Sequence, residues 1–384
     1  MADTIRLLHF ADVHLDRSFA WAEGALAGRR RQAIRDALVR VLDVARAERV
    51  DAVLCAGDLF NLEQVTPDTV AFLVAELARL APTPVLLAPG NHDWYGPRTP
   101  YAQAPWPANV LLFRTHELTP VPIAPGFTIW GAAHLAPAGT PDLLAGARAT
   151  GPGVHVGLVH AAEQLEHHPA DDSGLLPDPH APFDPEEVRS AGLLHLCTGH
   201  YHTPRDAALY TYPGNPEALG FASRRGLRGA VLHTFHADGG HERTRFPVDS
   251  GTLSELRLDV TGCASTQDVR ARIAGGVHDR RGVVRVELFG ELPPHATLEV
   301  SALQDSAPWL QALLCRDAGV RFAYDTEALG REQTVRGQFV RDVLAGQPLR
   351  DGPAPELDDR LRERVLAIGL RALDGRDDLD PGTI

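Results

Sequence analysis

Residues able to bind metal ions follow five short hydrophobic segments of this 384-residue chain, close to the end of each segment. Their side chains are carboxylates, imidazoles and an amide, a mixture that suits divalent transition metals. In chain order they are Asp12 and His14, Asp58, Asn91, His160, and His200 with His202. Taken singly, each is explained as a turn residue or a core histidine. The ordered set instead predicts a two-metal centre of the kind that cleaves phosphate esters.

The spacing of these residues indicates how they could share two ions. Asp12 and His14 lie two positions apart at the end of a predicted strand, so both can face one ion. His200 and His202 have the same spacing, and in an extended segment both side chains point to one side. Asp58 stands alone after its strand, which suits a carboxylate that bridges two ions held about 3.5–4 Å apart.

The hydrophobic segments before these residues are predicted to be strands. Segments 5–11, 50–56 and 85–88 are short and apolar, and patterns with helical spacing occupy 29–48 and 67–81 between them. Strands that alternate with helices form parallel sheets, and active groups gather at the carboxyl ends of such strands. After residue 108 the pattern changes to short strands separated by Pro and Gly, at 110–113, 128–132, 154–159, 193–198, 209–212 and 229–235.

Three regions are expected from these patterns. Residues 1–249 carry every metal-binding candidate, residues 250–330 are expected to form a small α+β domain, and residues 331–384 to form C-terminal helices. The expected elements after residue 250 are strands at 255–260, 283–289, 297–300 and 320–324, and helices at 265–274, 305–316, 331–345 and 356–373. The last of these helices has apolar residues at helical spacing, so it either docks on a partner or packs on its own domain.

Composition and charge exclude several classes of protein. No apolar run approaches about 18 residues, so no transmembrane helix is expected, and the first residues lack a signal-peptide pattern. The four cysteines are far apart without a CxxC pair, which favours a reducing cytoplasm. The net charge of −13 argues against holding nucleic acid by net charge alone, although bound metals can supply positive charge where a phosphate sits. All 37 basic residues are arginine, so any phosphate contact is made by guanidinium groups.

The order Asp-x-His, Gly-Asp, Gly-Asn-His-Asp, His, Gly-His-x-His resembles the calcineurin-like metallophosphoesterase superfamily. Two further segments look like the SbcD/YhaO group of DNA repair exonucleases, namely Gly57-Asp58-Leu59-Phe60 and Tyr212-Pro213-Gly214-Asn215-Pro216. The resemblance covers residues 5–235 well and 250–345 more loosely. It implies an α/β fold, a two-sheet metallophosphoesterase sandwich flanked by helices, with a small α+β capping domain and C-terminal helices.

The resemblance also implies a role for each residue of the set. One ion would be held by Asp12, His14, Asp58 and His202, and the second by Asp58, Asn91, His160 and His200. His92 would orient the scissile phosphate and protonate the departing 3′ oxygen, a task that suits an imidazole near neutral pKa. Asp93 either hydrogen-bonds His92 and fixes its tautomer or is a plain turn residue. Manganese is the expected ion.

Substrate contacts are expected at positions near these motifs, some of which depart from the family. Asn61 stands where the family commonly has a charged residue or histidine, and Asn215 stands where a small serine is usual. Arg224 and Arg225, with Arg228, could grip a DNA backbone just past that loop. Two more groups carry weaker expectations: Phe19 and Trp21 stack on a base or, as favoured here, pack, and Arg29-Arg30-Arg31 is expected as a solvated helix start. His167 and His168 are not expected to be ligands.

The leading hypothesis is therefore a manganese-dependent DNA phosphodiesterase, a 3′-to-5′ exonuclease with single-strand endonuclease activity in DNA repair. Its mechanism would be a two-metal hydroxide attack with His92 as general acid. The resemblance further implies a homodimer that works with a coiled-coil ATPase of the SMC type and has no membrane association. The alternatives are a small-molecule phosphodiesterase or phosphatase of the same superfamily and a non-catalytic scaffold subunit.

Overall fold

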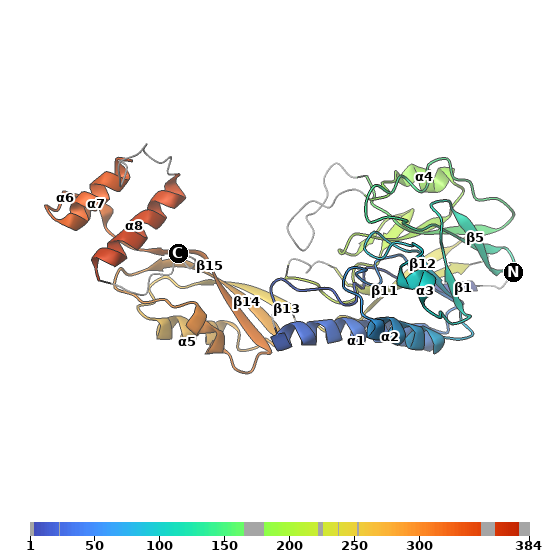
Figure 1. Ribbon diagram of the computed structural model, residues 1–384, viewed down its shortest axis with the longest axis horizontal. Coiled ribbons are helices and arrows are strands. Elements are labelled where there is room, and N and C mark those ends of the chain that lie inside the picture. Colours follow the sequence, from blue (N-terminus) through green and yellow to red (C-terminus); the bar gives the residue numbers. More distant parts are fainter. Residues whose placement is uncertain are drawn as a thin grey trace. The chain divides into compact units, whose positions relative to one another are not determined.

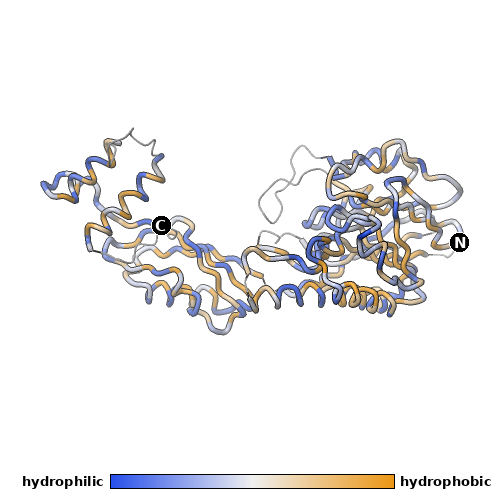
Figure 2. The backbone as a smooth tube through the Cα atoms, viewed as in Figure 1, coloured by the Kyte–Doolittle hydropathy of each residue, from blue (hydrophilic) through white to orange (hydrophobic). Residues whose placement is uncertain are grey.

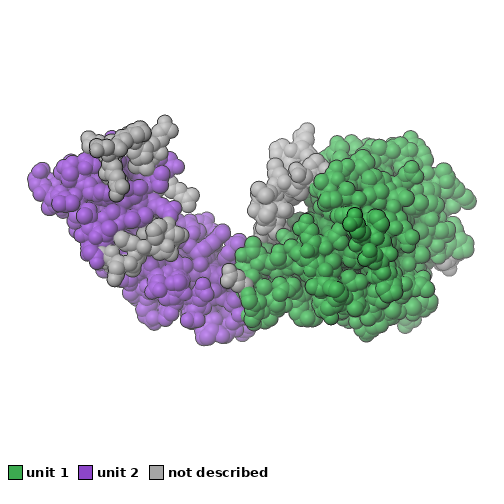
Figure 3. Space-filling model, in the orientation of Figure 1, with its two compact units in different colours: residues 1–251 green, residues 252–384 purple. Residues whose placement is uncertain are grey.

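The computed structural model describes residues 4–22, 24–164, 180–221, 226–236, 238–251, 253–346 and 358–375 (Figure 1). The chain divides into two compact units, Met1–Gly251 and Thr252–Ile384 (Figure 3). None of the helices within the described ranges is long and apolar enough to cross a membrane.

The first sheet of unit 1 has six strands in the order β12-β11-β1-β2-β3-β4. Four of them run parallel: β1 (Thr4–Phe10), β2 (Ala52–Cys55), β3 (Val85–Leu87) and β4 (Val110–Leu112). Helices α1 (Gly24–Glu48) and α2 (Pro67–Ala78) make the first two crossovers, as the alternating pattern predicts. The antiparallel strands β11 (Gly229–His236) and β12 (His241–Pro247) complete the sheet beside β1.

The second sheet also has six strands, in the order β5-β6-β7-β8-β10-β9. Its parallel centre consists of β6 (Phe127–Gly131), β7 (Val154–His160), β8 (His195–Gly199) and β10 (Tyr210–Tyr212). Antiparallel strands close both edges, β5 (Thr119–Ala124) beside β6 and β9 (Arg205–Asp206) beside β10. Short elements α3 (Pro100–Gln103) and α4 (Pro185–Ser190) lie in the connections.

The two sheets pack face to face because their strands carry apolar side chains on both faces. Leu7 and Leu54 of the first sheet share a buried core with Ile129 and Leu158 of the second. On the opposite face of the first sheet, Leu8 packs in a core with side chains of α1 spaced three or four residues apart. Hydrophobic and hydrophilic residues alternate along α1 in Figure 2. The predicted α/β fold of two sheets flanked by helices is confirmed.

Unit 2 is built on a three-stranded parallel sheet, β13 (Leu253–Asp259), β14 (Val283–Leu292) and β15 (Ala312–Phe322), in that order. Helix α5 (Thr266–Gly276) connects the first pair and the 3₁₀ helix η1 (Ser301–Ser306) precedes the third strand. The predicted strand at 297–300 and helix at 305–316 are therefore wrong. A short apolar run fits a buried helix and a buried strand equally well, and pairing with β14 decides the outcome here.

Three helices complete unit 2: α6 (Thr326–Arg331), α7 (Val335–Leu344) and α8 (Asp359–Leu373). The helix expected over 331–345 occurs as α7, which begins at Val335 because Thr334 caps it by accepting a hydrogen bond from the N–H of Gly337. The short helix α6 before it was not expected. Leu366 and Leu370 of α8 are buried in a cluster with side chains of α6 and α7. The terminal helix therefore packs on its own unit, while Leu361 and Leu373 remain exposed.

Candidate metal centre

Each predicted metal-binding residue lies at or just after the carboxyl end of a parallel strand. Asp12 and His14 follow β1, Asp58 follows β2 and Asn91 follows β3; in the second sheet, His160 ends β7, and His200 and His202 follow β8. These strands are neighbours within their sheets, so their carboxyl ends meet at one edge of the sandwich. The topology thus brings together residues that are up to 190 positions apart in the chain.

The backbone at this edge adopts conformations that are rare for residues other than glycine. Asp12, His14, Asp58 and His200 have φ angles of 55°, 53°, 52° and 113°. Hydrogen bonds between loops hold two of them, since the Asp12 N–H donates to Gly57 O at 3.1 Å and the His14 N–H donates to Asp58 O at 2.9 Å. Unfavourable backbone angles persist only where the surroundings enforce them, and they concentrate at functional sites.

The side chains converge on Asp58. Its Oδ2 lies 3.6 Å from Nε2 of His14 and 3.4 Å from Nε2 of His160. His202 Nε2 faces His14 Nε2 at 3.0 Å, and His160 Nε2 lies 3.0 Å from Oδ1 of Asn91. One carboxylate oxygen therefore stands between two groups of candidate ligands, as a bridging ligand requires.

The outer nitrogen of two of these imidazoles is already engaged. His160 Nδ1 donates to the carbonyl oxygen of Ala56 at 2.8 Å, and His14 Nδ1 donates to Asn61 Oδ1 at 2.8 Å. A carbonyl oxygen can only accept, so the proton sits on Nδ1 and the lone pair of Nε2 points into the site. Fixing the ring and its tautomer in this way is typical of histidines that bind metals.

The electrostatics of the site favour a bound cation. Burial, and then repulsion from Asp58, raise the pKa of Asp12 well above its usual value. Burial lowers the pKa of His14, His160 and His200, so these rings are neutral ligands at neutral pH. Two buried carboxylates surrounded by neutral imidazoles lack a compensating positive charge, which divalent cations would supply.

One polar atom of the site is buried without a partner. Nε2 of His200 makes no hydrogen bond among the described residues. Such atoms are rare because a buried polar group without a partner costs about 1–3 kcal/mol. Together with the two carboxylates, the amide and the other imidazoles, this atom fits a site that holds divalent ions.

Two glycines allow the loops to approach this closely. A Cβ on Gly90 would lie 2.3 Å from Oδ1 of Asp58, and a Cβ on Gly57 would lie 2.5 Å from Nδ1 of His160. Gly57 also has a φ of +87°. Any side chain at either position would displace a candidate ligand.

Asp93 binds the loops rather than the ring of its neighbour His92. Its carboxylate accepts four hydrogen bonds, from the N–H groups of Gly90 (2.6 Å), Asp58 (3.1 Å) and Leu59 (2.7 Å) and from the hydroxyl of Tyr101 (2.6 Å). Burial, and then repulsion from Asp58, raise its pKa to about 7. The residue thus fixes the turns after β2 and β3 together, a role that neither sequence interpretation included.

His92 is the exposed member of the group. Its backbone N–H donates to Oδ1 of Asp58 at 2.9 Å, and its ring centroid lies 5.0 Å from that of His14. A ring nitrogen of His92 also lies within 4.8 Å of ligand atoms of His14 and Asp58. The ring is therefore beside the metal residues and open to an incoming substrate.

The predicted substrate contacts have different surroundings. Asn61 is half-buried and is hydrogen-bonded to His14, a positioning role that the sequence did not reveal. Asn215 is fully buried and its Oδ1 accepts from the guanidinium of Arg228, which is buried too. The pair of Asn215 and Arg228 thus supports the loop after β10 from the protein interior. Arg224 and Arg225 lie outside the described residues, as do His167 and His168.

The aromatic pair after the first motif is packed. Phe19 is buried, and its ring centroid lies 5.5 Å from that of Trp21. Trp21 in turn contacts Phe221 edge-on at 5.0 Å. Packing, the favoured of the two interpretations, is what the structure contains.

The arginine run in α1 differs from expectation at its middle residue. Arg30 is buried and pairs with the carboxylate of Glu217 at 2.6 Å. The expectation of a solvated helix start is therefore wrong for Arg30, because the helix turns this side chain towards the loop that follows Asn215.

Two histidines near the centre escaped the sequence interpretation. The ring of His180 lies 5.6 Å from the ring of His200, and His134 Nε2 donates to the backbone oxygen of His160 at 2.6 Å. No hydrophobic strand ends just before His180, so the signal that identified the others is missing there. His134 stands three residues after the end of β6, a strand-end position like that of Asp58 after β2, and the sequence interpretation passed over it.

Comparisons with known proteins agree with this geometry. A family model described as calcineurin-like phosphoesterase matches residues 5–204. The chain is 25% identical over 264 residues to the uncharacterized metallophosphoesterase YhaO of Bacillus subtilis (strain 168), covering 64% of this chain and 61% of that protein. It is 32% identical over 92 residues to the DNA double-strand break repair protein Mre11 of Saccharolobus solfataricus, covering 23% of each. The chain thus spans less than two thirds of the length of these relatives.

Among solved structures, the crystal structure of TT1561 of Thermus thermophilus has a TM-score of 0.37 and 13% identity, covering 63% of this chain and 99% of that one.

Proposed function

Because the chain belongs to the calcineurin-like phosphoesterase family, we propose that it is a metal-dependent phosphoesterase whose substrate is DNA. The observation that carries the metal-dependent chemistry is the position of Asp58 Oδ2, within 3.6 Å of imidazole nitrogens from both sheets. The DNA substrate is supported by the name of one relative, the DNA double-strand break repair protein of Saccharolobus solfataricus.

The described residues form two ligand groups that share Asp12, and Asp58 belongs to the second of them and to a third group with His14 and His92. Asp12, His14 and His202 have ligand atoms within 4.8 Å of one another, as do Asp12, Asp58 and His160. We assign the first ion to Asp12, His14, Asp58 and His202, and the second to Asp58, Asn91, His160 and His200. Manganese is the proposed ion, as the resemblance to the family implies, and the carboxylate and amide oxygens of the site suit it.

The proposed ions and the side chains around them would each contribute to phosphodiester cleavage. Bound ions would neutralise charge on the phosphate oxygens and lower the pKa of water. His92, exposed beside the metal residues, donates a proton to the departing 3′ oxygen. Asp93 positions the loop that carries His92, and Asn61 positions His14. The general acid, the metal-binding residues and the hydrogen bonds that position them thus lie together at one edge of the sandwich, where a phosphoester substrate would bind.

The specific activity that we propose is that of a 3′-to-5′ exonuclease, with single-strand endonuclease activity, that works in DNA repair in the cytoplasm. Arg224 and Arg225 are proposed to contact the DNA backbone, and residues 250–330 are proposed to act as a capping domain. The four free cysteines support a reducing compartment.

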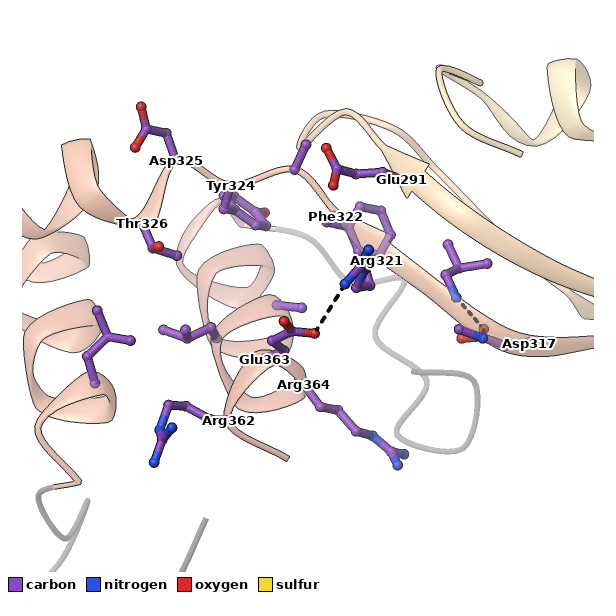
Figure 4. Close-up of a pocket in the computed structure, with 16 residues that line it drawn as sticks. Glu291, Asp317, Arg321, Phe322, Tyr324, Asp325, Thr326, Arg362, Glu363 and Arg364 are labelled. Carbon is purple, nitrogen blue, oxygen red and sulfur yellow. Dashed lines mark hydrogen bonds and ion pairs between the residues drawn. The ribbon is translucent and has the colours of Figure 1, made fainter. Parts of the chain in front are cut away.

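We propose that the ATPase partner docks on unit 2. A pocket lies between the end of β15 and α8, lined by polar side chains that include Arg321, Tyr324 and Glu363 (Figure 4). Arg321 and Glu363 face each other at 4.0 Å, and all the lining residues belong to unit 2. The pocket contains none of the metal-binding residues. We therefore propose that docking of a coiled-coil ATPase is separate from catalysis. We also propose that the protein forms a homodimer.

The test is cleavage of end-labelled single- and double-stranded linear DNA with manganese or magnesium, alongside hydrolysis of bis-p-nitrophenyl phosphate. We expect the wild type to shorten DNA from its 3′ ends and to hydrolyse the small diester. Hydrolysis of the small diester without any DNA cleavage would reject DNA as the substrate. Failure to hydrolyse either, with no bound metal, would identify a non-catalytic scaffold.

A further inference from the structure

A second group of histidines lies on the strands themselves, between the two sheets of unit 1. His9 belongs to β1, His233 to β11 and His241 to β12 in the first sheet, and His195 and Cys197 belong to β8 in the second. His233 is paired with Leu7 across the β1–β11 ladder, and Leu7 and Cys197 belong to the same inter-sheet core. We call these five residues the interior cluster.

Three members of the interior cluster bring ligand atoms together. Sγ of Cys197 lies 3.9 Å from Nε2 of His233, and the rings of His9 and His233 are 5.5 Å apart. One ligand atom of each of these three residues lies within 4.8 Å of the others, and all three side chains are buried. The first sheet thus provides two imidazoles and the second sheet one thiol.

The remaining members surround His233. Its Nδ1 lies 2.9 Å from Nε2 of His241, and the ring of His195 is 4.5 Å from that of His241. His195 Nε2 lies 2.9 Å from the hydroxyl oxygen of Thr211. These contacts orient His233 so that its Nε2 faces Cys197.

Polar atoms of the cluster are buried without partners. Both ring nitrogens of His9, and Nδ1 of His195, make no hydrogen bond of standard geometry among the described residues, although the backbone of Ala208 lies near His195. The backbone of Thr198 lies near His9 but makes no hydrogen bond of standard geometry with it. An aromatic residue would fill the same space without this cost, so the histidines require another explanation.

The charge state of the cluster leaves its nitrogens available as ligands. Burial lowers the pKa of His9 to about 3 and of His195 to about 2, so their rings are neutral at neutral pH. Burial raises the pKa of the Cys197 thiol, although a coordinated metal deprotonates a thiol outright. Two cations lie near the cluster, Arg245 beside His9 and Arg243 beside His233 and Cys197. Arg245 makes two contacts of 2.8 Å with Asp206, and Arg243 lies 3.9 Å from the same carboxylate.

We propose that His9, Cys197 and His233 bind one buried zinc ion, separate from the metal centre at the strand ends. Thiolate and imidazole ligands select zinc over manganese or magnesium, which prefer carboxylate and water oxygens. None of the five described residues of the interior cluster is a carboxylate. Three protein ligands leave the fourth position of a tetrahedral ion to water. Such an ion would tie β1 and β11 to β8, joining the two sheets.

The test uses full-length protein produced in cobalt-supplemented medium and purified under reducing conditions with excess manganese. Cobalt in the zinc site is expected to produce a near-ultraviolet charge-transfer band from the thiolate, with one cobalt per chain. Cys197→Ser is expected to remove the band. Cys55→Ser is the matched control, because Cys55 is also a buried strand cysteine but belongs to none of the candidate ligand groups of the described residues.

Absence of the band in the wild type, or its survival in Cys197→Ser, would overturn the proposal. If Cys197→Ser does not fold, X-ray absorption of the zinc-loaded wild type decides the matter. One sulfur neighbour at about 2.3 Å supports the site, and a shell of nitrogen and oxygen alone rejects it. Neither measurement depends on the substrate of the enzyme.

Discussion

Unit 1 contains two buried groups of histidines that differ in how their rings are held. In the metal centre, the rings of His14 and His160 donate through Nδ1 to fixed acceptors, and the carboxylate of Asp58 lies between them. In the interior cluster, the rings sit on extended strands, and both nitrogens of His9 have no partner among the described residues. His233 of the interior cluster also has its Nδ1 engaged, by His241 at 2.9 Å. The comparison therefore teaches that the carboxylate beside the rings, rather than the outer hydrogen bond, distinguishes a site prepared for chemistry from one that can only join two sheets.

A chelator is expected to remove metal from the metal centre but not from the interior cluster. The metal centre borders the exposed ring of His92, whereas His9, Cys197 and His233 are fully buried. Dialysis against EDTA should therefore abolish diester hydrolysis and remove manganese, while zinc in the interior cluster remains bound. Metal analysis before and after dialysis, with recovery of activity on adding manganese, checks this. Loss of both metals at the same rate would remove the distinction.

Asp58→Asn is expected to lower hydrolysis of bis-p-nitrophenyl phosphate by roughly 10⁴-fold, because losing several kcal/mol of charge stabilisation has that effect on the rate. Since Asp58 Oδ2 approaches ligands of both proposed ions, both should bind more weakly. Metal titration by calorimetry, with the interior cluster unchanged as internal reference, measures this. Weakening of one ion alone would exclude the bridging role.

His92→Ala is expected to lower hydrolysis by about 10³-fold, within the range for removal of a general acid. Manganese content should stay at the wild-type value, because His92 is proposed to act on the substrate. Activity and metal analysis of the same preparation provide the measurement. A fall in manganese content parallel to activity would make His92 a ligand.

Asn61→Ala is expected to reduce manganese affinity or activity by about 10–100-fold, as for loss of a hydrogen bond behind a metal-binding histidine. Asn61→Asp should restore most of the loss, since a carboxylate also accepts from His14 Nδ1. Manganese titration of both variants checks this. Equal losses in the two variants would point instead to direct contact between the amide and the substrate.

Asp93→Asn is expected to lower the free energy of unfolding by about 1–3 kcal/mol, because an amide nitrogen would face backbone N–H donors. Tyr101→Phe removes only one of the four donors and should have the smaller effect. Urea unfolding of metal-free protein measures both. An effect of Tyr101→Phe as large as that of Asp93→Asn would show that the backbone contacts contribute little.

The fold and the metal residues were predictable because both depend on local patterns. Alternating apolar strands and amphipathic helices determine the parallel sheet, and each candidate ligand follows a strand directly. The interior cluster lacks such a signal. Its five members are spread over four strands, and each reads as an ordinary residue of its own segment. Strand pairing in the first sheet brings His9, His233 and His241 together, and the packing of the second sheet on the first adds His195 and Cys197.

The wrong predictions of secondary structure in unit 2 and the unforeseen role of Asp93 have the same origin. Residues 312–315 form a short apolar run whose strand conformation is decided by pairing with β14. Asp93 reads as one more polar residue in a turn, and only the tertiary structure shows which N–H groups its carboxylate meets. Roles that depend on a partner distant in the sequence are therefore the ones that pattern analysis leaves open.

The position of Asp93 has a consequence for how the metal centre fills. One carboxylate grips the turn that carries Asp58 and the turn that carries Asn91, so neither turn can shift alone. An ion that orders the first turn would therefore also pre-arrange the second for its neighbour. Uptake of the pair should follow a steep, sigmoidal titration with few half-loaded molecules.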